Sequence, residues 1–248
     1  MSPAAPASIA VISDVHGNRW ALEAVLRDIE RRGVNNIVNL GDCLYGPLDP
    51  AGTADILLPR EFPTVRGNED RIITENGPGN PTLDFVRGEL GREQIYWLAH
   101  LPETAVAFHT MFMCHGSPAS DTEYLLHEVK ADGASRRSDE GIMERLGTID
   151  SPVIACGHDH LPFSKLLPDG RLVVDPGSVG LPAYTDDAPF PHAMEAGSPH
   201  ARYRIVFVTA DGWQAEGVTV EYDVEAAAEA AERNGRPDWA RWLRTGRA

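Results

Sequence analysis

The chain has 248 residues, of which 42% are hydrophobic and 24% are charged, as is ordinary for a protein with a packed core. Its formal net charge of −15 argues against general affinity for nucleic acid or anionic membranes, which needs a basic surface. No apolar run approaches the ~18 residues of a membrane helix, and residues 1–8 lack the basic and apolar segments of a secretory signal. We therefore expect a cytoplasmic protein.

The N-terminal part alternates short apolar runs with the spacing of an apolar helix face. Strands are expected at residues 8–13, 36–40 and 62–65, and helices at residues 20–29 and 51–58. Strands that alternate with helices predict a parallel sheet with helices packed on it. Residues 83–101 follow as a further expected helix.

From residue 105 the pattern becomes rich in strands. They are expected at residues 105–109, 111–114, 153–156, 163–167, 172–174, 203–209 and 214–222. The Asp211-Gly212 step between the last two is typical of a hairpin turn. Residues 180–200, rich in Pro, Asp, Gly and Ala, predict a long loop.

An alanine-rich segment at residues 224–233 predicts a helix that Gly235 ends, and Pro237 begins a short final helix. We expect an α/β fold, a four-layer α/β/β/α sandwich with two facing sheets of mainly parallel or mixed strands. One domain would span residues 1–248, with a core at 7–222, the long loop at 180–200 and C-terminal helices at 223–248.

Polar clusters follow five of the predicted strands. They are Asp14-Val15-His16-Gly17-Asn18, Gly41-Asp42, Arg66-Gly67-Asn68-Glu69-Asp70, His115-Gly116 and Gly157-His158-Asp159-His160. Ligands of open α/β sheets bind beyond the carboxyl ends of the strands, so these clusters can converge on one pocket. Asp, His and Asn offer the oxygen and nitrogen ligands that suit Mn²⁺, Fe or Zn²⁺. One cluster alone would be explained by a turn or a cap, but five in order predict a metal site.

The ordered series of motifs resembles the calcineurin-like metallophosphoesterase superfamily, and especially its compact bacterial phosphodiesterase-like members, which carry the P-G-S-V-G found here at residues 176–180. The resemblance implies two transition-metal ions, Mn, Fe or Zn, and hydrolysis of a small phosphate ester by an activated water. It also implies the ligands: Asp14, His16 and His160 for one ion, Asn68, His115 and His158 for the other, and Asp42 as the bridge.

One position departs from the family pattern. The family usually has His between the Asn and Asp of the third motif, where it contacts the phosphate and assists the leaving group; here the residue is Glu69. An ionised Glu cannot donate a hydrogen bond. Glu69 is therefore either protonated or turned towards Arg66 or Arg71, and we expect the arginine pairing because positive charge favours the ionised form.

The catalytic candidates are Asn68, Glu69 and Asp70, and the candidates for substrate binding are Asn18, Tyr45 and Arg66. The Arg66 side chain could pair with a phosphate oxygen or with a neighbouring carboxylate. Tyr45 could stack on a base or ring, or it could anchor its own loop. His127 matches no metal motif, and a packing or surface role is the favoured interpretation.

The main hypothesis is an enzyme that cleaves a phosphodiester or phosphomonoester, with a nucleotide among the candidate substrates. The alternative is a catalytically weak scaffold for protein interactions, similar to the retromer subunit of this fold. The complete ligand set favours the enzyme, and Glu69 is the one point for the scaffold. No serine-hydrolase elbow, P-loop or H-E-x-x-H motif is present. The ester cleaved, the native metals and the oligomeric state stay open.

Overall fold

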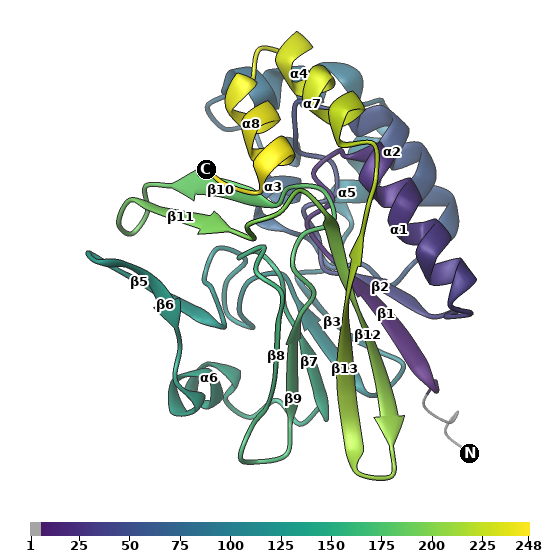
Figure 1. Ribbon diagram of the computed structural model, residues 1–248, viewed down its shortest axis with the longest axis vertical. Helices are drawn as coiled ribbons and strands as arrows, with labels where there is room; N and C mark the ends of the chain where they lie inside the picture. Colours follow the sequence, from purple (N-terminus) through teal and green to yellow (C-terminus); the bar gives the residue numbers. More distant parts are fainter. Residues whose placement is uncertain (1–5) are drawn as a thin grey trace.

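The computed structural model describes residues 6–248, so most of the N-terminal segment examined for a secretory signal lies outside the described residues. Two sheets face each other (Figure 1). The first has the strand order β13-β12-β1-β2, in which β1 pairs parallel with β2 and antiparallel with β12. Its strands are Ser8–Ile12 (β1), Ile37–Asn39 (β2), Ala201–Thr209 (β12) and Gly212–Val220 (β13).

The second sheet has the order β3-β4-β7-β9-β8, with parallel pairs at its centre and antiparallel pairs at its edges. Its strands are Thr104–Ala107 (β3), Met111–Cys114 (β4), Val153–Ala155 (β7), Phe163–Leu166 (β8) and Leu172–Asp175 (β9). Two separate hairpins are formed by His127–Lys130 (β5) with Gly133–Arg136 (β6), and by Ala183–Asp186 (β10) with His192–Glu195 (β11).

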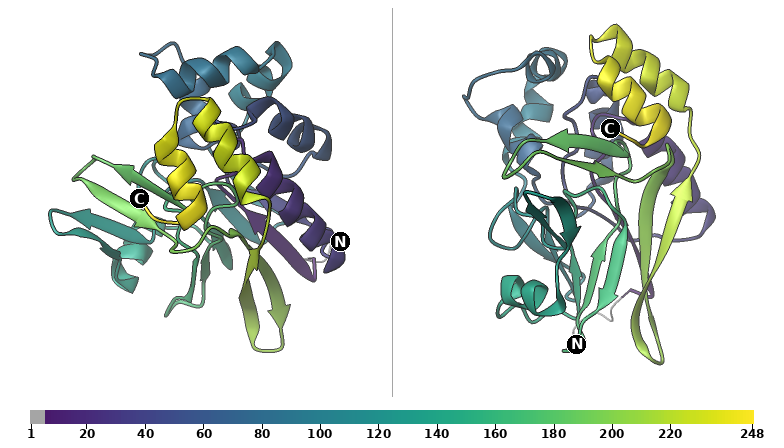
Figure 2. Two further views of the ribbon diagram at one scale, coloured as in Figure 1. Left: turned by 45° about the horizontal axis from the view of Figure 1, so that its top comes forward. Right: turned by 60° about the vertical axis from the view of Figure 1, so that its left-hand side comes forward.

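Helices cover the outer faces of both sheets. They are Arg19–Arg31 (α1), Pro50–Leu57 (α2), Asn68–Thr74 (α3), Pro81–Glu89 (α4), Arg92–Ala99 (α5), Asp139–Leu146 (α6), Val224–Arg233 (α7) and Pro237–Thr245 (α8), with a 3₁₀ turn at Leu58–Arg60. Figure 2 shows α7 and α8 packed together, with α8 beside the β10–β11 hairpin. None of the helices in residues 6–248 combines the length and hydropathy needed to cross a membrane.

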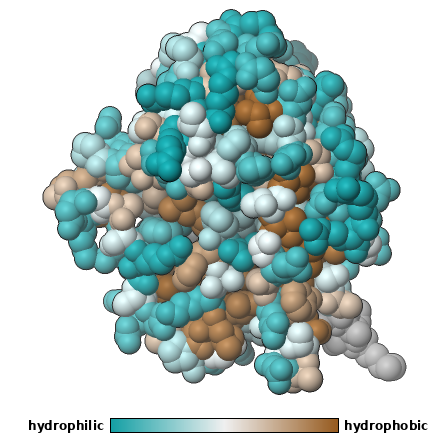
Figure 3. Space-filling view, in the orientation of Figure 1, coloured by the Kyte–Doolittle hydropathy of each residue, from teal (hydrophilic) through white to brown (hydrophobic). Residues whose placement is uncertain are grey.

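Side chains that alternate along each strand create the layers. On β1, Ile9 and Val11 pack between the two sheets, whereas Ala10 and Ile12 pack under the helices of the first sheet. On β7, Ile154 belongs to a third core beneath α6. On the face shown in Figure 3, hydrophobic residues appear only as separate small patches. The fold is therefore the four-layer α/β/β/α sandwich that the sequence predicts.

Three predicted elements differ from the structure. The expected strand at 62–65 is reduced to a single parallel bridge between Thr64 and Asn39. The helix expected at 83–101 is divided into α4 and α5, because Gly91 has extended backbone and caps α5. The loop expected at 180–200 contains the β10–β11 hairpin, in which alternate residues of β11 are buried despite the polar composition.

Asp28 joins helix α1 to the first sheet. Its carboxylate accepts hydrogen bonds from the Tyr203 hydroxyl on β12 at 2.7 Å and from Arg31 and Arg32 at 2.6 and 2.8 Å. Burial alone would raise the pKa of Asp28, but the three donors outweigh it and lower that pKa. The ionised form of Asp28 therefore stabilises the folded state.

We predict that Asp28→Asn lowers the free energy of unfolding by about 1 kcal/mol at neutral pH, because a charged acceptor forms stronger hydrogen bonds. The folded-state pKa lies below the unfolded value of about 3.9. The parent's advantage is therefore complete above that value and is lost as the pH falls through the folded-state pKa. Urea denaturation of the metal-free protein measures it, with exposed Asp55→Asn as the control. If the difference in unfolding free energy between the parent and Asp28→Asn did not change with pH, the ionised Asp28 carboxylate would not be its source.

Candidate metal centre

The five polar motifs meet at one edge of the two sheets. Asp14 and His16 follow β1, Asp42 follows β2, Asn68 begins α3, His115 follows β4, and His158 and His160 follow β7. Two groups have ligand atoms that all lie within 4.8 Å of one another: Asp14 with His16 and His160, and Asp42 with His115 and His158. A third such group joins Asp42 to His16 and Glu69. Asp42 thus lies next to residues that the sequence assigns to both of the expected ions.

Backbone carbonyls fix three of the imidazole rings. The Nδ1 atoms of His16, His115 and His160 lie 3.0, 2.8 and 2.7 Å from the carbonyl oxygens of Tyr45, Leu40 and Leu181, respectively. A carbonyl oxygen can only accept, so each Nδ1 carries the proton and each neutral ring presents its Nε2 lone pair to the cluster. Such contacts behind the ring are typical of histidines that bind metals.

Electron-rich atoms face one another at short range. His16 Nε2 lies 3.1 Å from His160 Nε2, and His160 Nε2 lies 3.3 Å from Asp14 Oδ1, an atom with no hydrogen-bond partner within residues 6–248. His115 Nε2 lies 3.3 Å from Asp42 Oδ2 and 3.0 Å from Asn68 Oδ1. These contacts are repulsive unless positive charge lies between them, so the residues fit bound metal cations.

The pKa values of His16, His115 and Asp14 also indicate that the cluster favours positive charge. Burial alone would lower the pKa of His16 and His115, but the neighbouring carboxylates outweigh it and raise these values to about 9 and about 10. Burial would raise the pKa of Asp14, which the surrounding histidines instead lower. Protons can supply this charge when the cluster is free, and metal binding displaces them.

The ligand loops have strained backbone. Positive φ angles of 51–74° occur at five proposed ligands, Asp14, His16, Asp42, His158 and His160. Side chains rarely adopt this left-handed region, and such strain concentrates at functional sites. Gly67 is needed for the close approach of two loops, because a Cβ there would lie 2.0 Å from Asp42 Oδ1. The folded chain therefore supports a geometry that the loops alone would not favour.

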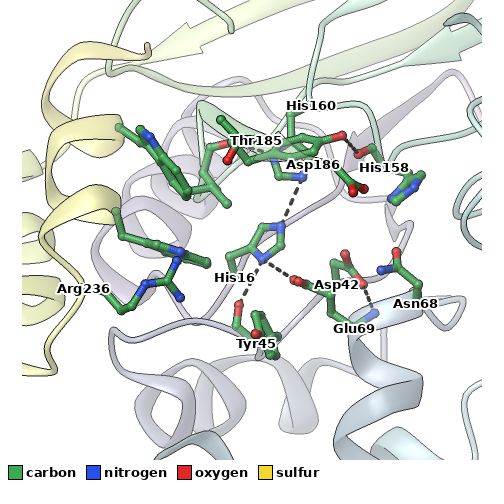
Figure 4. A pocket seen from close by; sticks show the side chains of 14 residues that line it. His16, Asp42, Tyr45, Asn68, Glu69, His158, His160, Thr185, Asp186 and Arg236 are labelled. Atoms are coloured by element: carbon green, nitrogen blue, oxygen red, sulfur yellow. Dashed lines mark hydrogen bonds and ion pairs between the residues drawn. The ribbon is translucent and has the colours of Figure 1, made fainter. Parts of the chain in front are cut away.

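Glu69 faces the cluster and not the arginines, so the expected arginine pairing is wrong. Its Oε2 lies 3.0 Å from His16 Nδ1 (Figure 4), whereas Arg66 pairs with Glu103 and Arg71 pairs with Asp121 and Glu75. The N–H of His16 points at the Tyr45 carbonyl, which leaves Oε2 without a donor among the described residues. Burial consequently raises the pKa of Glu69 to about 7, although His16 opposes the increase.

Three other predicted site residues have structural partners. Asp70 accepts hydrogen bonds from the backbone N–H groups of Cys43 and Gly67, which joins two ligand loops. Asn18 caps α1 through Ala21 N–H and donates to the Gly180 carbonyl from a fully buried position. Arg66 lines a different cavity, beside His115. Asp70 and Asn18 thus stabilise the loops of the cluster, and the catalytic role of Asp70 and the substrate-binding roles of Asn18 and Arg66 stay predictions.

A cavity of about 270 Å³ opens beside the cluster (Figure 4). Tyr45 lines it, as expected of a substrate-binding candidate, together with the proposed ligands His16, Asp42, Asn68, His158 and His160. Sequence reasoning missed the remaining wall, formed by Tyr184, Thr185 and Asp186 of β10 and by Arg236, Trp239 and Trp242 of the C-terminal segment.

His127 also occupies an unexpected position. Its Nδ1 lies 2.6 Å from Asp159 Oδ2, both side chains are buried, and His127 lines a second cavity together with Asn68 and His158. Asp159 lies between two proposed ligands in sequence, so this contact supports their loop from behind.

The calcineurin-like phosphoesterase superfamily domain matches residues 8–192, and the chain belongs to this family. It is 28% identical to an uncharacterized protein of Methanocaldococcus jannaschii, over 93% of this chain and 94% of the relative. It is similar in structure to a metallophosphoesterase from Sphaerobacter thermophilus, with a TM-score of 0.74 and 24% identity over 96% of this chain and 98% of the other. A hypothetical protein from Pyrococcus horikoshii is also similar in structure, with a TM-score of 0.72 and 20% identity over 96% of this chain and 98% of that protein. The resemblance drawn from the motifs is confirmed.

We predict that the protein binds two Mn²⁺ or Zn²⁺ ions per chain and that binding raises its melting temperature, since a ligand at 100 times its Kd adds about 2.7 kcal/mol of stability. Elemental analysis and thermal melts measure both effects. His16→Ala should lose most of the rise in melting temperature, whereas exposed His100→Ala should keep it. No bound metal in the parent protein, even with excess Mn²⁺, would refute the site.

Proposed function

We propose that the chain is a phosphoesterase that uses two transition-metal ions, Mn, Fe or Zn, to hydrolyse a small phosphodiester or phosphomonoester. The convergence of carboxylate oxygens and imidazole lone pairs at the wall of an open cavity supports this proposal. Two ions bound there would act as Lewis acids on the phosphoryl group and lower the pKa of water so that it attacks near neutral pH.

The residues of this chain hold the site in a fixed geometry. Asp42 receives the Glu69 N–H at its Oδ1, 2.9 Å away, while its Oδ2 faces His115. Asp14 accepts the His158 N–H at its Oδ2, 3.2 Å away, which leaves its Oδ1 directed at the imidazoles. Each carboxylate therefore has one oxygen fixed by backbone and the other free to bind a cation.

Charge explains how an acidic protein could hold a phosphate. Asp14 and Asp42 bring two negative charges to the cluster, and two divalent ions bring four positive charges. The site would stay net positive even with Glu69 ionised as a third carboxylate. Burial keeps water away from these charges, so their attraction for an anion is screened less than at the surface.

The alternative of a scaffold on this fold makes a different prediction about turnover. A scaffold needs no complete ligand set, whereas each of the seven proposed positions here carries a side chain able to bind a metal. Metal binding without hydrolysis of any ester tested would favour the scaffold.

We predict turnover in a screen of chromogenic phosphomonoesters and phosphodiesters with Mn²⁺, Zn²⁺ or Mg²⁺, and its loss on chelation. Asp42→Asn should reduce metal affinity and activity more than a change at any ligand of one ion, because Asp42 adjoins both groups. The variant should also lose the metal-dependent rise in melting temperature. An Asp42→Asn protein that melts and turns over like the parent would show that Asp42 is not the bridge.

We predict that Glu69→His accelerates hydrolysis of esters with poor leaving groups far more than that of nitrophenyl esters, because metal ions bound beside His16 and Asp42 would keep Glu69 ionised and unable to donate a proton. A positioned proton donor contributes about 10²–10⁴-fold when the leaving group needs protonation, and Glu69 lines the cavity beside His16. Glu69→Gln is the matched control, since it removes the charge without adding an acid. Equal acceleration of both ester types by Glu69→His would mean that residue 69 does not reach the leaving group.

A further inference from the structure

The cavity beside the metal centre has two walls of different origin. The proposed metal ligands lie within residues 8–192, the part of the chain that matches the family domain. Arg236, Trp239 and Trp242 come from the C-terminal segment beyond that domain. In Figure 4, Arg236 lies on the opposite side of His16 from Asn68 and His158. The cavity thus extends from the metal centre towards α8.

Aromatic rings dominate the α8 side. The ring of Trp239 lies edge-on to the ring of His16 at 5.8 Å and lies 6.5 Å from Tyr45 and 6.2 Å from Trp242, between centroids. The Arg236 guanidinium lies 5.4 Å from the centre of the Trp239 ring. A phosphate held at the metal centre would therefore place its organic group against aromatic side chains.

A buried donor on this wall has no partner. Trp242 is 6% exposed, and its indole Nε1 finds no hydrogen-bond acceptor in the described part of the chain. Buried polar groups are nearly always paired, so this N–H calls for an explanation. A ligand acceptor would pair with this N–H only if the Trp242 ring turned its indole nitrogen towards the cavity that it lines.

The wall is held firmly in place. Arg236 donates to Thr82 Oγ1 at 2.6 Å and pairs with Asp238 at 2.7 Å, and Asn234 donates to the Pro47 carbonyl at 3.0 Å. Pro47 lies in the loop that follows Asp42, so these contacts attach the helix pair α7–α8 to the ligand loops. A rigid aromatic wall can bind a planar ring with little loss of conformational freedom.

From these contacts we propose that Tyr45, Trp239, Trp242 and Arg236 form a subsite for a planar aromatic ring, so that the substrate is a phosphate ester of the nucleoside class. This inference rests on the proposed function, because it assumes that the phosphate lies at the metal centre. Stacking on aromatic side chains is sequence-tolerant, so the subsite would favour a base over none without selecting one base strongly.

Binding to the metal-loaded full chain tests the subsite without turnover. Isothermal titration with the non-hydrolysable 5′-phosphonate analogues of adenosine 5′-monophosphate and of ribose 5-phosphate compares two ligands that share the phosphonate and the sugar but differ in the ring. We expect the nucleotide to bind about 5- to 100-fold more tightly, the range given by one stacked base. Equal affinities, or no binding of either compound, would overturn the inference.

Three variants locate the effect. Trp239→Leu should reduce the nucleotide preference at least about 5-fold, whereas Trp97→Leu, on α5 and outside the cavity lining, should leave it unchanged. If Trp239→Leu fails to fold, Trp242→Phe is the second variant. It keeps an aromatic ring and removes only the unpaired N–H. It should therefore melt like the parent and bind the nucleotide less tightly. A preference that survives in both folded tryptophan variants would place the ring elsewhere and overturn the inference.

The outcomes separate this inference from the proposed function. Hydrolysis of simple esters together with equal binding of the two ligands would leave the phosphoesterase in place and remove the aromatic subsite. Ring-dependent binding without hydrolysis of any ester would retain the subsite and refute the proposed enzyme.

Discussion

Buried carboxylates and imidazoles lie close together at the edge of the two sheets, and they are stable there only with positive charge among them. The rest of the structure depends on this constraint. Asp14 and Asp42 are 0% and 2% exposed, and burying such charges is unfavourable unless they are paired. The three loops that carry Asp14, Asp42 and His158 also adopt left-handed backbone at five proposed ligands. Two packed sheets and the interlocked loops stabilise this arrangement, in which Asp70 joins the loop of Asp42 to helix α3. A bound cation would relieve the electrostatic part of the cost, and the fold offsets the conformational part.

The convergence of the five polar motifs could be predicted from the sequence because the position of each motif is set locally. An Asp or His directly after a buried strand has a defined place at the sheet edge, and five such places converge. The motifs do not indicate the hydrogen-bond partners of the residues beside the proposed ligands. Asn18 and Asp70 lie in the same motifs as His16 and Asn68, but their side chains accept hydrogen bonds from the backbone N–H groups of Ala21 and Gly67 at the starts of α1 and α3. A motif does not distinguish a residue that binds a metal from one that holds the loop in place.

Contacts between distant segments were beyond sequence reasoning. The sequence predicts a short final helix that Pro237 begins, yet nothing in the sequence places Trp239 of this helix against His16. The orientation of Glu69 was mispredicted for a related reason: nearby arginines in sequence were assumed to be free, but Arg71 has Asp121 as its partner fifty residues away. The composition of residues 180–200, rich in Pro, Asp, Gly and Ala, predicted a loop. The β10–β11 hairpin forms there nevertheless, with alternate residues of β11 buried.

The proposed metal ligands and the proposed aromatic subsite occupy different walls of the cavity, but the two walls are in contact. Trp239 touches His16, whose ring must keep its orientation towards the Tyr45 carbonyl. A change at Trp239 can therefore disturb the metal centre as well as the subsite. Trp242 lies one helical turn farther along α8 and has an aromatic contact with Trp239. A change at Trp242 therefore alters the proposed aromatic subsite and leaves the contact between Trp239 and His16 in place. Residues on α8 thus differ in how strongly they couple to the ligands, and that coupling limits how freely this helix could vary to suit another organic group.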